Sequence, residues 1–178
     1  PALNFDYLAG EKLIVWWHGA CTPEGASVAM MGDGAAAQTV PGWRVRVDPS
    51  GKFNVGTHSA VAATSAYSVN SDGIVFDGTP HSFGFVLDGQ TRRHGMWSDE
   101  IYQSAFAGQY AAFSGFTEVD TRTSATVNIG SANPAPGTTG GIAVQTRALV
   151  ILRLPPSVAV PSVQTMTDLF TQLRANPG

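Results

Sequence analysis

Hydrophobic and polar residues alternate along much of the first 154 residues, as in strands that bury one face. Between Trp43 and Val47 apolar residues alternate with arginines, and the alternation resumes at residues 52–55 after Asp48-Pro49-Ser50-Gly51. A proline at the second position of such a tetrad is typical of a type I turn. Residues 43–55 therefore predict a β-hairpin.

Other segments predict further strands. The run Lys12–His18 (KLIVWWH) is rich in β-branched and aromatic residues and has no polar face, which predicts a strand buried on both sides. Shorter apolar or alternating segments bounded by Asp-Gly and other turn residues predict strands at 73–76, 81–87, 93–98, 125–129 and 142–154.

One late segment has the helical period instead. Val163, Met166, Leu169 and Leu173 recur at spacings of three and four after Pro161-Ser162. This spacing predicts an amphipathic helix over 162–174, with Ser162 as its N-cap.

Many short strands and one C-terminal helix predict an all-β fold, an antiparallel sandwich or barrel. The 31 Gly and Pro residues among 178 disfavour a helical bundle, and no repeat or linker divides the chain. We expect one domain over residues 1–178, with a strand core at about 11–154.

Three stretches lack a clear pattern. The apolar residues of 98–123 fit neither period, which leaves a long functional loop and irregular edge strands as alternatives. Residues 56–70 and 131–140 are rich in small residues and suit flexible contact with neighbours.

Taken in order, several motifs resemble the concanavalin A-like jelly roll of laminin-G-type and pentraxin-type domains. The motifs are Leu13–Trp17, Met31–Gly34, Trp43–Val55, Asp77–Gly89, Val127–Gly130 and Gly141–Leu152. Within Asp77–Gly89, Pro80 stands where the family usually has Trp, and His81 matches a packed strand histidine. The resemblance implies a jelly-roll sandwich of two stacked antiparallel sheets. It does not imply one function, because this fold serves many.

The charge and hydropathy patterns argue against a nucleic-acid partner and against a membrane span. The net charge is −3, and Arg92-Arg93 is the densest basic spot, so no phosphate-neutralising stripe is present. No apolar stretch approaches 18 residues, and Pro1–Gly10 does not resemble a secretory signal. Pro1-Ala2 looks like the remainder of a trimmed initiator Met, so we expect a chain made in a cytoplasm.

Catalytic patterns are incomplete. Some glycosidases of this fold place three acids along one strand, and here Glu118-Val119-Asp120 is followed by Arg122 and Thr123 where a second Glu is needed. No G-x-S-x-G elbow and no phosphate loop occurs. We therefore predict that the protein is not an enzyme and assign no catalytic residue.

Metal patterns are also weak. Neither the lone Cys21 nor the four histidines, at 18, 58, 81 and 94, have the spacing of a zinc site. The resemblance makes calcium the one cofactor to consider, with Asp33, Asp48, Asp99 and Glu100 as donors. Because Asp33 and Asp48 precede Gly or Pro, we predict that these two form turns instead.

The stretch Met96–Tyr102 is the best candidate for sugar binding. A ring face stacks on sugar C–H groups while a polar side chain binds hydroxyls, which makes Trp97, Asp99 and Tyr102 the candidate residues. The alternative is that Trp97 lies on a strand and packs in the core. Tyr67, Tyr102 and Tyr110 also suit a protein interface.

Three functions remain in order of preference. The first is a structural subunit of a larger assembly, a bacteriophage capsid decoration or tail protein that is homo-oligomeric or binds other virion proteins and is located in the virion. The second is an extracellular lectin-like module that binds cell-surface glycans. The third is a degenerate glycoside hydrolase.

Overall fold

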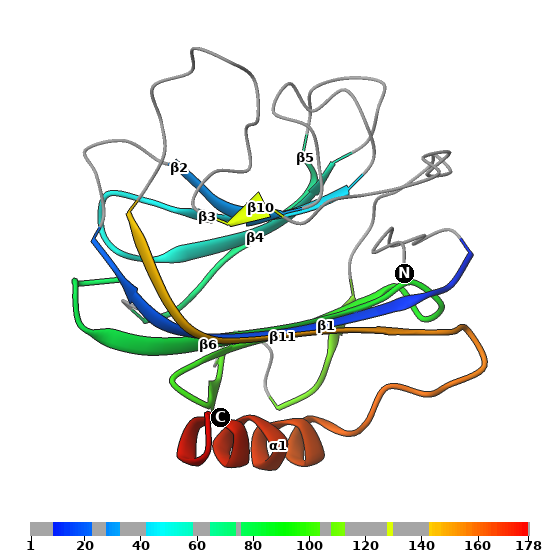
Figure 1. Ribbon diagram of the computed structural model, residues 1–178. Coiled ribbons are helices and arrows are strands. Elements are labelled where there is room, and N and C mark those ends of the chain that lie inside the picture. Colours follow the sequence, from blue (N-terminus) through cyan, green and yellow to red (C-terminus); the bar gives the residue numbers. More distant parts are fainter. Residues whose placement is uncertain are drawn as a thin grey trace.

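The computed structural model describes residues 9–22, 28–32, 42–58, 65–73, 76–103, 108–112, 128–129 and 143–177. Within these ranges the chain forms two antiparallel sheets that lie face to face, with one helix against the outer face of one sheet (Figure 1). This is the sandwich with a C-terminal helix that the sequence predicts.

The first sheet is built on the apolar N-terminal run. Its strand order is β11 (Val144–Leu154), β1 (Lys12–Cys21), β6 (Pro80–Asp88), β7 (Arg93–Ser98) and β8 (Ile101–Tyr102), and β9 (Ala111–Ala112) also pairs with β7. β1 pairs with β11 on one side and β6 on the other. All its residues but Ala20 are buried, as its continuous apolar sequence predicts.

The second sheet contains the predicted hairpin. Its order is β10 (Asn128–Ile129), β2 (Val28–Gly32), β3 (Gly42–Val47), β4 (Phe53–His58) and β5 (Ser65–Asn70). Between β3 and β4, the Asp48 carboxylate accepts hydrogen bonds from the backbone N–H groups of Ser50 at 2.8 Å and Lys52 at 3.1 Å. Asp48 therefore has the turn role that the sequence predicts for it.

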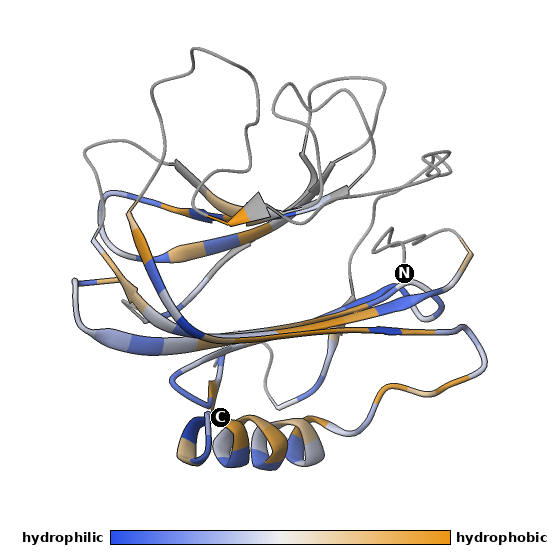
Figure 2. Cartoon of the chain, viewed as in Figure 1, coloured by the Kyte–Doolittle hydropathy of each residue, from blue (hydrophilic) through white to orange (hydrophobic). Residues whose placement is uncertain are grey.

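The main core fills the space between the sheets. Alternate residues of β1, β3, β4 and β6 point into it, and its largest side chains are Trp17, Trp43, Phe53, Phe76, Phe83 and Phe85. Several of these rings stack, with Phe53 and Phe83 centroids 5.0 Å apart. Figure 2 shows the hydrophobic residues along the strands of both sheets.

A second core lies on the other face of the first sheet, beneath helix α1 (Val163–Ala175). Met166 and Phe170 of the helix are buried against Ile14, Trp16, Val86 and Trp97. The helix begins where predicted, because the Ser162 hydroxyl accepts a hydrogen bond from the Thr165 N–H at 3.1 Å. Gly84 allows the helix to pack closely on the sheet, because a Cβ at this position would lie 2.5 Å from the Phe170 ring.

Three of the less regular segments differ in how far the structure agrees with the sequence-based predictions. Gly73 and Phe76 are not in strands, so the strand predicted at 73–76 is wrong at its described ends, and residues 74–75 lie outside the described part. Of the strand predicted at 125–129, residues 128–129 are described and form β10. Where 98–123 is described, it contains the short strands β8 and β9, as in the edge-strand alternative. No helix among the described residues is long and apolar enough to cross a membrane.

Candidate functional site

A hollow of about 420 Å³ opens where the two sheets meet at one end of the sandwich. Its described lining residues are Asp72, Gly73, Ser98, Asp99, Ile101, Tyr102 and Gln103. Asp72 and Gly73 follow β5 of the second sheet, and the others belong to the β7–β8 hairpin of the first. Both the hairpin and the loop after β5 are therefore needed to form it.

The hairpin turn at the hollow is unusual in having no glycine. Asp99 and Glu100 link β7 to β8 with φ values of 46° and 63°. A two-residue turn of this kind requires positive φ at both positions, which asparagine and glycine adopt more readily. The surrounding contacts must hold these two residues in place.

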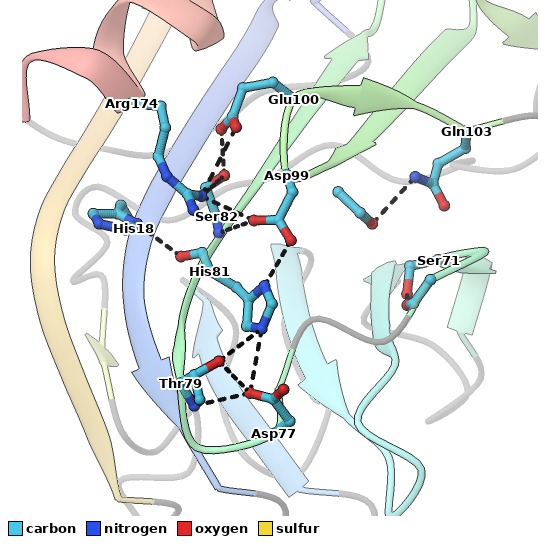
Figure 3. A network of polar contacts seen from close by, with 12 residues as sticks. His18, Ser71, Asp77, Thr79, His81, Ser82, Asp99, Glu100, Gln103 and Arg174 are labelled. Carbon is cyan, nitrogen blue, oxygen red and sulfur yellow. Dashed lines mark hydrogen bonds and ion pairs between the residues drawn. The ribbon is translucent and has the colours of Figure 1, made fainter.

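Asp99 receives most of those contacts. One carboxylate oxygen accepts hydrogen bonds from the Ser82 N–H at 3.0 Å and from Arg174 of α1 at 2.8 Å. The other accepts from His81 Nδ1 at 2.6 Å (Figure 3). Burial opposes ionisation of Asp99, but the Ser82, His81 and Arg174 contacts outweigh it and lower its pKa.

Ser82 and Glu100 complete the link to the helix. The Ser82 hydroxyl donates to Glu100 and accepts from Arg174 at 2.9 Å. The Arg174 guanidinium also lies 3.8 Å from the second Glu100 oxygen. One arginine near the end of the helix therefore neutralises part of the charge of two adjacent turn carboxylates.

His81 extends the network to the start of β6. Its Nε2 lies 3.2 Å from Asp77 Oδ1 and 3.0 Å from the Thr79 hydroxyl, while its Nδ1 faces Asp99. The Thr79 hydroxyl and N–H donate to Asp77 and lower its pKa. The packed strand histidine implied by the resemblance is thus partly exposed, with a side chain bracketed by two carboxylates.

Gln103 joins the two sides of the hollow. Its side-chain oxygen accepts a hydrogen bond from the Asp72 N–H, and its amide nitrogen donates to the Ser98 hydroxyl at 3.1 Å. Ser71 anchors the same loop to β4, because its hydroxyl accepts from the Phe53 N–H at 3.1 Å. These contacts fix the shape of the hollow before any ligand arrives.

Ile101 gives the hollow its apolar surface. The residue is 71% exposed, and its side chain faces the opposite side of the hairpin from Tyr102 because the two are successive residues of β8. Tyr102 is half-buried, with its ring 4.7 Å from Trp97 and its hydroxyl donating to the Gln109 carbonyl at 2.8 Å. Burial raises the Tyr102 pKa, so the phenol stays neutral.

Trp97 does not have the exposed ring that sugar stacking needs. The side chain is fully buried, with its ring 5.1 Å from Phe170 and its indole N–H donating to the Thr167 hydroxyl at 2.9 Å. The core alternative for this residue is therefore correct. The alternation along β7 that places Met96 in the main core turns Trp97 toward the helix.

Two of the three candidate residues, Asp99 and Tyr102, do line the hollow. Asp72, Gln103 and the role of Ile101 were not predicted from the sequence. A large apolar residue directly after a charged turn was the one available signal for Ile101. Nothing in the sequence linked Asp72 to Gln103, which are 31 residues apart.

The tyrosines proposed for an interface differ in surroundings. Tyr110 is half-buried, with its hydroxyl donating to the Pro161 carbonyl at 2.8 Å. Tyr110 therefore packs within its own chain. The Tyr67 side chain lies outside the described part.

The described donors do not suit a calcium ion. Asp99 and Glu100 face Arg174 and His81, and Asp48 binds its own turn, while Asp33 lies outside the described residues. In the described ranges no three or more His, Cys, Asp or Glu side chains gather to hold a metal. Cys21 and His18 are buried, and His18 contacts the His81 carbonyl at 2.9 Å.

Glu118 and Asp120, the acids considered for glycoside hydrolysis, lie outside the described residues. The side chain of His58 also lies outside them, and His94 is 2% exposed. Burial lowers the pKa of His94 to about 4. The ring is therefore neutral at ordinary pH, which suits its buried position on β7.

Comparison with known proteins identifies similar structures at low sequence identity. No protein-family model matches the sequence, and neither does any curated protein. The CBM40 domain of a Ruminococcus gnavus sialidase, bound to α2,3-sialyllactose, is 13% identical with a TM-score of 0.55, and the match covers 90% of this chain and 83% of that one.

Two other similar structures come from different kinds of protein. A heptameric SAP-like pentraxin from Limulus polyphemus is 13% identical with a TM-score of 0.53, over 80% of this chain and 64% of that one. A botulinum neurotoxin type C structure, described as interacting with two ganglioside molecules, is 10% identical with a TM-score of 0.58, over 92% of this chain and 36% of that one. The protein therefore has the concanavalin A-like jelly-roll fold.

Proposed function

We propose that this protein is a non-enzymatic carbohydrate-binding module and that its glycan site is the hollow beside the β7–β8 turn. The observation that carries the proposal is that Ile101, a large apolar residue, is 71% exposed beside the polar lining residues Asp72, Ser98 and Gln103. A site for small polar ligands combines an apolar surface with a few placed polar groups.

The chemistry of the lining suits a sugar ring. Ile101 offers an apolar surface to the C–H face of a ring, in place of the aromatic stack expected at Trp97. Carboxylate and hydroxyl oxygens near it accept hydrogen bonds from sugar hydroxyls. The volume of about 420 Å³ lies within the range of small-ligand sites and holds one or two sugar units.

The similar structures support the same choice. The CBM40 structure is described as bound to sialyllactose, and the neurotoxin is described as interacting with gangliosides. Both use the present fold, although fold alone does not transfer a ligand. An extracellular location, where glycans are displayed, forms part of this proposal.

The virion and hydrolase hypotheses need tests of their own. Assembly into a virion as a capsid decoration or tail subunit stays a prediction, as do homo-oligomer formation and a virion location. A degenerate hydrolase would depend on Glu118. A glycosidase assay of Glu118→Gln beside the wild type would reveal that activity.

The test is a glycan array followed by calorimetric titration of the strongest binder. We expect saturable binding by the wild type and at least a ten-fold loss of affinity in Ile101→Ser. Val158→Ser is the matched control, because Val158 is 42% exposed and does not line the hollow. Equal affinity of Ile101→Ser and wild type would exclude the hollow, and no binding to any glycan would exclude the function.

A further inference from the structure

One edge of the first sheet has no neighbouring strand in the described part of the chain. β11 pairs with β1 on its inner side, and it is the last strand of the sheet in that direction. Alternate residues of an edge strand point their backbone N–H and C=O groups outward, where another strand can pair with them. This edge is eleven residues long and contains no proline, so it is available for such pairing.

The middle of β11 has the sequence of an interior strand. Ala148–Leu152 (ALVIL) is an uninterrupted apolar run, and the side chains of Ala148–Ile151 alternate between the main core and the core beneath α1. The run is nevertheless only partly buried, and Leu152 is 41% exposed, whereas each residue of Leu13–Trp17 in β1 is at most 3% exposed. A further strand beside β11 would bury the apolar surface that is left open.

A second copy of the same strand fits this edge. Two copies can pair antiparallel about a twofold axis at Val150, which is the centre of the apolar run. Leu149 of one copy then lies opposite Ile151 of the other. The exposed Leu152 likewise lies opposite Ala148, whose small side chain leaves room for it. The run is thus complementary to itself over five positions.

The charges that flank the run permit this pairing. It brings Arg147 of one copy close to Arg153 of the other, and Arg153 is already bound to Glu11. The Glu11 carboxylate therefore offsets the repulsion between the two arginines. Arg147 also marks the end of the regular ladder, because the register of β11 with β1 shifts between His18 and Gly19.

The opposite edge of the sheet limits such an assembly to two copies. β8, the strand at that edge, has two residues, and β9, which also pairs with β7, has two as well. Pairing of β11 with either of them would give a very short ladder, so an open chain of copies is disfavoured. Two β11 strands that pair with each other leave no long edge among the described strands of this sheet.

We infer that the protein forms a homodimer in which two β11 strands join the first sheets of two copies into one continuous sheet. This inference does not depend on the proposed function. It assigns a surface to the homo-oligomer predicted from the sequence. The hollow stays open in the dimer, because it lies beside β8 at the opposite edge of the sheet, and one dimer therefore presents two hollows.

The experiment measures molar mass by light scattering over a dilution series. We expect the wild type to have twice the 18.6 kDa of one chain at high concentration and to approach 18.6 kDa on dilution. Leu152→Lys places a charge at the edge, and we expect it to weaken dimerisation by roughly ten-fold or more. Ile129→Lys is the matched control, because Ile129 is 44% exposed on β10 of the second sheet. It should dimerise as the wild type does.

Hydrogen exchange of the wild type tests the same surface without a substitution. The outward-facing amides of Ala148–Leu152 should exchange more slowly as the protein concentration rises, because pairing protects them. If Leu152→Lys lacks the circular dichroism spectrum of the wild type, the exchange measurement decides alone.

Three results would overturn the inference. The first is a wild-type mass that stays at one chain or exceeds that of a dimer. The second is a folded Leu152→Lys that dimerises as tightly as the wild type, or an Ile129→Lys that does not dimerise. The third is exchange of Ala148–Leu152 that is independent of protein concentration.

Discussion

Trp97 and Ile101 lie four residues apart on adjacent strands, yet the first is fully buried and the second is 71% exposed. Trp97 belongs to the packed region beneath α1, where Phe170 and Met166 cover it. Ile101 belongs to the open hollow beyond the turn. A large apolar side chain thus stabilises the fold at one position and is available to a ligand at the other.

The difference has a local cause. The Asp99-Glu100 turn reverses the chain, so that Tyr102 lies opposite Trp97 and Ile101 lies opposite Ser98. The helix covers the face that carries the Trp97 ring, whereas Ile101 on the opposite face is open to the hollow. Substitutions in the packed region should therefore change stability, whereas those in the hollow should change binding.

The largest effect is expected at Trp97. Trp97→Ala removes a buried ring that packs on Phe170 and Tyr102, and we expect a loss of about 3–5 kcal/mol in the free energy of unfolding. Urea denaturation measures it. A loss below about 1 kcal/mol would mean that Trp97 is not part of a packed core.

The next effect depends on pH and comes from His94. Its folded-state pKa of about 4 lies below the ordinary 6.5, so the unfolded chain binds the proton more tightly. The contribution of His94 to the free energy of unfolding is complete above pH 6.5. It should therefore fall by roughly 3 kcal/mol as the pH falls from 6.5 to 4. His94→Gln should lose this part of the pH dependence, and urea denaturation across that range measures both variants. An NMR titration of the ring near 6.5 would contradict the prediction.

A glycine pair compares the two regions directly. In Gly84→Ala the new methyl would lie 2.5 Å from the Phe170 ring, and we expect a loss of roughly 1–3 kcal/mol. At Gly73, which lines the hollow, a Cβ would meet nothing within 4 Å, so Gly73→Ala should change stability by less than about 0.5 kcal/mol. Thermal unfolding of both proteins measures this difference, and equal losses would contradict the contrast between packed and open regions.

A smaller loss of stability than that of Gly84→Ala is expected at Arg174. Arg174→Gln removes its contacts with Asp99 and Glu100, and we expect a loss of roughly 1 kcal/mol because the side chain is 33% exposed. Affinity for glycans should fall as well, since Asp99 then loses a contact that holds the turn. A variant with wild-type stability and wild-type affinity would show that the network does not support the hollow.

The sequence predicted the parts of the molecule that follow from periodicity. The alternation at 43–55 gave the β3–β4 hairpin, the continuous run at 12–18 gave the doubly buried β1, and the spacing from Val163 to Leu173 gave α1. Each of these depends on residues close together in the chain.

The hollow was only partly predictable, because it depends on contacts that are distant in sequence. Asp99 and Tyr102 were candidates for the site. The turn with positive φ at Asp99 and Glu100 was not predicted, because neither position has the glycine that usually indicates such a turn. Arg174 meets Asp99 across 75 residues, and Gln103 meets the Asp72 N–H across 31. Trp97 is a residue type that often occurs in sugar-binding sites, but its position on β7 places its ring in the core.

The most direct test of the account is to map the bound glycan by NMR, following backbone amide shifts during titration with the tightest ligand from the array. We predict that the largest shifts occur at residues 72–73 and 98–103, with little change along α1. Shifts concentrated on β11 or on the second sheet, with 98–103 unchanged, would contradict the claim that the hollow is the glycan site.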